Sequence, residues 1–130
     1  MSDLEEAEAW LSSARYLLQT EAGRRSWRTV AVAQSIHSMI KTNDALTFRF
    51  LGRRASRHED SAALLKELAR RHLIPKKYAD RREAFALALR EKSEYDYGGA
   101  EIGRIEAERR VRRAEVFLAA VRDILAAHET

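Results

Sequence analysis

The segment Leu89-Arg-Glu-Lys-Ser-Glu-Tyr-Asp-Tyr-Gly-Gly99 brings two cations, two phenols and three acids together within a few residues. Arginine and lysine bind phosphate oxygens, and a tyrosine hydroxyl donates hydrogen bonds to them. A tyrosine with its ordinary pKa near 10 is a poor base at neutral pH, so the segment suits binding of an anion better than proton abstraction. The candidate catalytic residues are Arg90 and Tyr95, and the candidate ligand-binding residues are Lys92, Asp96 and Tyr97.

A structural role for the same segment is the competing interpretation. Arg90 and Glu94 are four residues apart, which places them on one helix face where they can form an ion pair. The two tyrosines would then cover the end of a helical bundle, where Gly98-Gly99 lets the chain turn.

His37 and Asp44 form a second candidate site, because a spacing of seven residues puts both on one side of a helix. With Gln34 and Lys41 they could line a polar pocket that binds a ligand. The alternative is a solvated helix face or a polar seam between two subunits.

Composition excludes several classes of protein. The chain has 130 residues, 45% of them hydrophobic and 34% charged, which fits one compact domain covering residues 1–130. It has no cysteine, and its four histidines lack ligand spacing such as His-x-x-x-His, so we expect no metal site and no cofactor. The acidic N-terminus and the absence of a long apolar run predict no membrane span and a cytoplasmic location.

The elements that would position these residues are helices. One proline and five glycines interrupt a chain dominated by good helix formers. Possible N-terminal capping signals occur at Ser2-x-x-Glu5, Ser56-x-x-Glu59 and Asp80-x-x-Glu83. The periodicity predicts helices from Ser2 to about Gly23, from Ser26 to about Leu51, from Ser56 towards Ile74-Pro75, from Asp80 to before Gly98, and over the final apolar stripe from Ala107 to Leu125. We therefore predict an all-α fold, an up-and-down antiparallel bundle of about five helices whose second helix is central.

Charge gives an independent prediction. The formal net charge is +4 and the isoelectric point about 9.7. If every connection reverses the chain direction, the first and third connections share one end of the bundle. That end would present a basic patch that attracts the phosphates of a nucleic acid. The candidate nucleic-acid-binding residues are Arg24, Arg25, Arg28, Arg70, Arg71, Lys76, Lys77, Arg81 and Arg82.

The order of several short motifs resembles a known family. These motifs are Glu8-Ala-Trp-Leu-Ser-Ser-Ala14, Asp44-Ala-Leu46 before Leu51-Gly52, His58, Arg90-x-x-x-x-Tyr95-Asp96-Tyr97, and Ala114-Glu-x-Phe-Leu118. Together they span nearly the whole chain, and in this order they are similar to the HEPN family, the higher eukaryotes and prokaryotes nucleotide-binding domains.

The resemblance implies a helical bundle, often dimeric, found in toxin modules beside a small nucleotidyltransferase and in RNA-directed defence systems. It also implies that ribonuclease members use an arginine followed four to six residues later by a histidine. Arg90 fits the arginine position, but Tyr95 occupies the histidine position. Arg53-x-x-x-x-His58 has the spacing, but it lies between two helices where the family does not place the motif, so we interpret it as accidental.

Three hypotheses follow. The first, which we favour, is a dimeric binding module that engages RNA, a nucleotide or a nucleotidyltransferase-type partner. The second is a metal-independent ribonuclease in which Arg90 acts with Tyr95 or with a histidine from elsewhere. The third is a structural interaction bundle without a nucleic-acid role.

Overall fold

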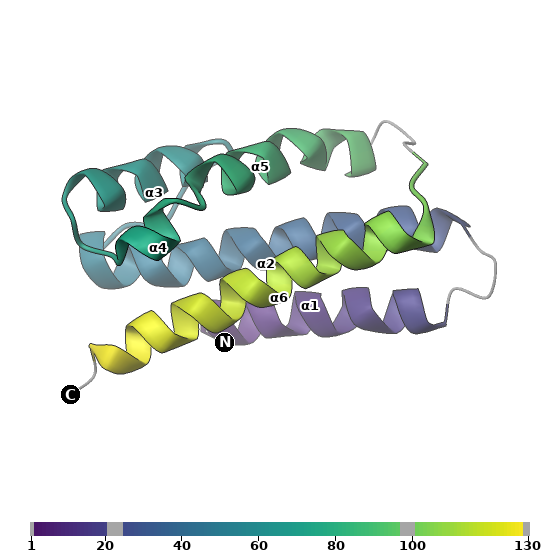
Figure 1. Cartoon of the computed structure of the whole chain (residues 1–130), viewed down its shortest axis with the longest axis horizontal. Helices are drawn as coiled ribbons and strands as arrows, with labels where there is room; N and C mark the ends of the chain where they lie inside the picture. The colour runs from purple at the N-terminus through teal and green to yellow at the C-terminus, as the bar shows by residue number, and fades with distance from the viewer. Residues whose placement is uncertain (1, 21–24, 97–100, 129–130) are drawn as a thin grey trace.

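The computed structural model describes residues 2–20, 25–96 and 101–128. These residues form six helices and no strand, so the all-α prediction is confirmed (Figure 1). No helix in the described part of the chain is long and apolar enough to cross a membrane. The helices are α1 (Asp3–Gln19), α2 (Arg25–Leu51), α3 (Asp60–Arg70), α4 (Lys76–Ala79), α5 (Arg82–Asp96) and α6 (Arg104–Ala127).

The long helix α2 is the centre of the bundle, as predicted. It packs against α1, α3, α5 and α6. Small and polar side chains such as Ala31, Ser35 and Ser38 are as buried as its large apolar ones. A helix that is buried on most of its circumference lies in the interior of the domain, so α2 determines where the other helices can pack.

The four long helices α1, α2, α5 and α6 alternate in direction, but α3 does not follow the pattern (Figure 1). After Gly52, which has a φ of 69°, the chain returns along α2. Thr47 Oγ1 donates a 2.8 Å hydrogen bond to the Arg53 carbonyl, and Asn43 Nδ2 donates a 3.0 Å bond to the Ser61 carbonyl. The third helix therefore begins beside the middle of α2 and runs in the same direction as α2.

The capping predictions have mixed outcomes. Ser2 Oγ accepts the Glu5 N–H at 3.1 Å, which confirms the first cap. The second is wrong, because α3 begins one turn later than Ser56 and its N-cap residue Glu59 makes no side-chain cap. The third is also wrong: Asp80 ends the short helix α4, which the sequence did not predict, and its carboxylate binds Lys76 at 3.0 Å.

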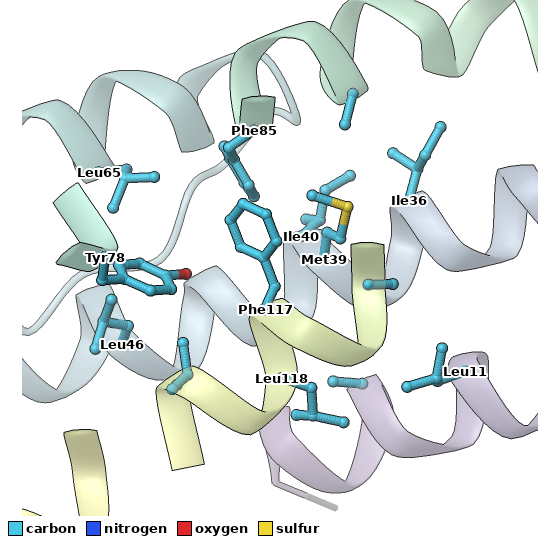
Figure 2. Packing of buried hydrophobic residues seen from close by; sticks show 14 of the residues in the cluster. Leu11, Ile36, Met39, Ile40, Leu46, Leu65, Tyr78, Phe85, Phe117 and Leu118 are labelled. Atoms are coloured by element: carbon cyan, nitrogen blue, oxygen red, sulfur yellow. The ribbon is translucent and has the colours of Figure 1, made fainter. Parts of the chain in front are cut away.

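Aromatic side chains join the later helices to the core (Figure 2). The Phe117 ring of α6 lies 5.7 Å from the Tyr78 ring and 5.8 Å from the Phe85 ring, measured between centroids. The predicted apolar stripe of α6 is confirmed, with Ala107, Val111, Ala114, Leu118 and Val121 buried, while Leu125 is only partly covered.

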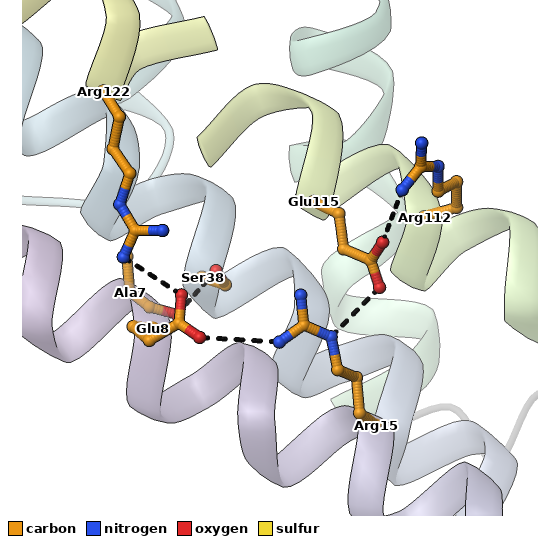
Figure 3. A network of polar contacts seen from close by, with 7 residues as sticks. All are labelled: Ala7, Glu8, Arg15, Ser38, Arg112, Glu115 and Arg122. Carbon is orange, nitrogen blue, oxygen red and sulfur yellow. Dashed lines mark hydrogen bonds and ion pairs between the residues drawn. The ribbon is translucent and has the colours of Figure 1, made fainter. Parts of the chain in front are cut away.

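Ion pairs cross the seam between α1 and α6 (Figure 3). Arg15 Nε lies 3.1 Å from Glu115 Oε1, and Arg122 Nη2 lies 3.2 Å from Glu8 Oε2. On the other side of α1, Ser38 Oγ of α2 donates a 2.8 Å bond to the Ala7 carbonyl. These contacts fix the position of α1 against the two helices that run antiparallel to it.

Candidate functional site at the end of helix α5

Arg90 lies on the exposed surface of α5. Its guanidinium makes no hydrogen bond or ion pair with the part of the chain that the structure describes, so the expected pair with Glu94 is not formed. Lys92, on the same helix, is partly buried. Tyr97 lies outside the described residues, as does the side chain of Asp96.

Tyr95 is partly buried and packs against the hydrophobic core. Loss of water around its hydroxyl raises its pKa above the ordinary value of 10, although the positive charge of Arg110 partly opposes this. The hydroxyl is therefore protonated at neutral pH and donates a hydrogen bond rather than removing a proton.

Three residues around Tyr95 were missed in the sequence. Glu91 is one turn before Tyr95 on the same face of α5, and its carboxylate meets Arg110 and Arg113 of α6. Arg110 Nη1 hydrogen-bonds Glu91 Oε2, and its Nε binds Glu106 Oε1 at 3.1 Å. Arg110 thus links Glu106, on its own helix, to Glu91 on α5.

Arg113 shares the same carboxylate but is less well satisfied. Its Nη2 lies 3.5 Å from Glu91 Oε2, the oxygen that Arg110 already contacts. Its Nε and Nη2 have no hydrogen-bond partner among the described residues, and burial lowers its pKa. Its side chain is only 17% exposed, so water covers little of it. The site therefore holds a buried guanidinium with unused donors.

The sequence carried only a weak indication of this cluster. Arg110 and Arg113 are three residues apart and share one face of α6, but so do many pairs in a helix with a high content of arginine. Only the packing of α5 against α6 shows that this face is covered.

The second candidate site is a packed seam within one chain. The His37 ring stacks on the Trp10 ring with 4.7 Å between centroids and meets the His58 ring edge-on at 5.4 Å. Asp44 is buried, its carboxylate accepts the Ala55 N–H, and burial raises its pKa. Lys41 Nζ binds Glu6 at 2.9 Å instead of joining Asp44. The polar residues thus connect α2 to α1 and to residues 52–59.

The basic residues do not form the single patch that we expected. Arg28 lies near the start of α2, whereas Arg70, Arg71, Lys76, Lys77, Arg81 and Arg82 surround α4 at the opposite end of the bundle (Figure 1). The expectation was wrong because α3 runs parallel to α2 instead of reversing. Arg24 and the side chain of Arg25 lie outside the described residues.

Part of the basic group around α4 is neutralised within the chain. Arg70 and Arg71 both bind the Glu67 carboxylate at 2.6 Å, and these contacts lower the pKa of Glu67 to about 2. Lys77 and Arg81 line a hollow of about 290 Å³ beside Asp123. Whether either basic group binds nucleic acid stays a prediction.

No three side chains of the His, Asp and Glu types converge as a metal site within residues 2–20, 25–96 and 101–128. At the end of α5, Arg110 and Arg113 of α6 contact the Glu91 carboxylate, and Tyr95 follows Glu91 one turn later on the same helix face.

Comparison with known proteins gives one positive result. The family model described as HEPN domain matches residues 2–124, nearly the whole chain. A search of the curated proteins finds no match. With a bundle of alternating long helices and this nearly full-length match, the chain belongs to the HEPN domain family.

Proposed function

We propose that this chain is a HEPN-family binding module that engages RNA or a nucleotide at the end of α5, and that it is not a ribonuclease. The observation that carries the proposal is the state of Tyr95. It follows Arg90 at the distance where the resemblance implies a histidine, the ordinary pKa of a phenol is near 10, and burial raises the pKa of Tyr95 further.

Chemistry explains why this residue decides between binding and cleavage. Cleavage of RNA by its own 2′-hydroxyl needs a group that accepts that proton. A tyrosine with a raised pKa accepts it poorly but donates well to a phosphate oxygen. Arg90 is exposed and unengaged by the described residues, so it is available to a phosphate in solution.

The proposal includes a second copy of the chain and a nucleotidyltransferase-type partner. Tyr16 of α1 is 62% exposed and Ile105 of α6 is 69% exposed. Because α1 and α6 are antiparallel, both side chains lie near the end of the bundle at which α5 ends. We place the contact at this end because the two most exposed large hydrophobic side chains of the described residues lie there.

A single gel tests the proposal. End-labelled single-stranded RNA is incubated in EDTA with the parent protein, with Arg90→Ala, and with Lys77→Ala as a control that removes an exposed cation at the opposite end. We expect intact RNA and a mobility shift that Arg90→Ala weakens more than Lys77→Ala. Cleavage that Arg90→Ala abolishes would replace the proposal with the ribonuclease. Intact RNA without any shift would favour the structural bundle.

A further inference from the structure

We infer that Arg110 and Arg113, with Tyr95 beside them, form an oxyanion pocket that binds one phosphate group of a nucleotide or RNA. The inference rests on the proposed function and deepens it by naming the residues that receive the phosphate. Arg110 and Arg113 belong to α6 and contact Glu91 of α5, the residue that follows the exposed Arg90 in the chain.

Arg110 and Arg113 share one carboxylate oxygen. Both guanidinium groups contact Glu91 Oε2, and Arg110 has Glu106 as a second carboxylate. Arg113 has only its 3.5 Å contact with Glu91. The carboxylates of Glu91 and Glu106 balance the two positive charges, but these contacts do not use all ten N–H donors of the two arginines, so the pair keeps unused donors.

The cluster is also largely buried. The side chains of Glu91, Arg110 and Arg113 are 12%, 22% and 17% exposed. Buried polar groups in proteins are nearly always hydrogen-bonded, yet Arg113 Nε and Nη2 have no partner among the described residues. Those two N–H groups lie on one edge of a planar fork, the edge that binds two oxygens of a phosphate.

A phenol follows Glu91 on α5. Glu91 and Tyr95 are four residues apart, so Tyr95 lies above Glu91 on the same helix face. Burial raises the pKa of its hydroxyl, and the charges of Arg110 and Arg113 oppose this while those of Glu91 and Glu94 add to it. A protonated phenol on the helix face of Glu91 supplies a further donor, and a phosphate has enough acceptor lone pairs for all three groups.

Titration of the whole chain with ligand, followed by NMR of the backbone amides, tests the pocket. The probes are inorganic phosphate, 5′-AMP and a short single-stranded RNA, with adenosine as the uncharged control. Arg113→Met replaces the guanidinium with an apolar chain, and Arg113→Lys keeps the charge but loses the fork. Arg122→Met is the matched control, because Arg122 is a partly exposed arginine of α6 that pairs with Glu8 far from the pocket.

We expect the parent to bind phosphate and 5′-AMP but not adenosine. Arg113→Met should weaken 5′-AMP binding about tenfold or more, as loss of a charge-assisted fork contact predicts. Arg113→Lys should fall between the two, and Arg122→Met should change the affinity by less than about twofold. Unchanged affinity in Arg113→Met, or no binding of phosphate and 5′-AMP by the parent, overturns the pocket.

The RNA probe separates failure of the pocket from failure of the proposed function. A parent that binds 5′-AMP through Arg113 but binds no RNA would keep the pocket and limit the function to nucleotides. RNA binding by the parent that Arg113→Met leaves unchanged would keep the function and overturn the pocket. Thermal unfolding of each variant without ligand shows whether a loss of binding is only a loss of folding.

Discussion

Asp44 shows how burial changes the pKa of a single carboxyl group. Its carboxylate lies inside the bundle, accepts the Ala55 N–H, and has a raised pKa because burial disfavours its charged form. Its Oδ1 has no hydrogen-bond partner among the described residues. Asp44 is therefore part of the interior of the bundle and not an exposed ligand-binding group.

The first prediction concerns the pH dependence of Asp44. Because its folded pKa lies above the unfolded value of about 3.9, it favours folding below that value. That contribution is lost as the pH rises through the raised folded pKa. Asp44→Asn removes the titration, so the parent should lose stability relative to the variant as the pH increases.

The measurement is the free energy of urea unfolding of both proteins from pH 3.5 to pH 8. The expected relative loss is about 1.4 kcal/mol for each unit by which the pKa is raised. Glu6, Glu67 and Glu115 have lowered pKa values and act in the opposite direction, but they are present in both proteins. A difference that stays constant across the range would contradict the raised pKa.

At the scale of elements, close packing of α1 against α2 depends on small side chains. Ala7 and Ala14 of α1 are fully buried, and Ser38 of α2 approaches closely enough to bond the Ala7 carbonyl. The spacing of Leu4, Ala7, Leu11, Ala14 and Leu18 was visible in the sequence, so this face of α1 was predictable.

We predict that Ala7→Leu destabilises the protein by about 1–3 kcal/mol, because a larger side chain in a filled contact forces neighbours apart. Ala9→Leu is the matched control: Ala9 is exposed on the same helix, and its replacement should change stability by no more than about 0.5 kcal/mol. Urea unfolding of the two variants and the parent compares them. Equal effects of the two changes would show that α1 is not packed as described.

The direction of α3 depends on contacts that side-chain periodicity does not reveal. The hydrogen bond from Thr47 Oγ1 to the Arg53 carbonyl and the one from Asn43 to Ser61 hold the returning chain against α2. A pattern of apolar residues predicts that a helix forms and which face is buried, but it does not predict the path of the loop before it. The sequence-based assumption of reversal at every connection therefore failed here.

Two threonine-to-valine substitutions test these contacts. Thr47→Val keeps the shape of the side chain but removes the hydrogen bond to the Arg53 carbonyl. It should lower the free energy of unfolding by about 0.5–1.5 kcal/mol and speed amide exchange in residues 53–59. Thr42→Val removes only a bond within α2, to the Ser38 carbonyl, and serves as the control. Amide exchange followed by NMR distinguishes them, and equal protection of residues 53–59 in both variants would refute the role of Thr47.

At the scale of the whole molecule, the bundle was predictable because its core follows helix periodicity throughout. The stripe of α6 and the central position of α2 both came from the spacing of apolar residues. The cluster of Glu91, Arg110 and Arg113 was not predictable, because it depends on which charged faces of α5 and α6 meet. Charge placement also failed, since the single basic patch required a direction for α3 that the chain does not follow.

The last prediction follows from this division of charge between the two ends. Arg90→Glu and Lys77→Glu each change the net charge by the same amount, and both residues are exposed. If RNA were held only by the overall charge of the chain, the two variants would weaken binding equally. If RNA binds at the end of α5, Arg90→Glu replaces a cation of that helix with a carboxylate and should weaken binding several-fold more than Lys77→Glu.

RNA affinity measured at several salt concentrations gives the comparison. Each phosphate contact contributes a slope of about −0.7 to the dependence of log affinity on log salt for a single strand. We expect Arg90→Glu to lose about one such contact and Lys77→Glu to lose less. A larger loss in Lys77→Glu would move the RNA surface to the basic residues around α4, because that end would then make the contacts that counterion release reports.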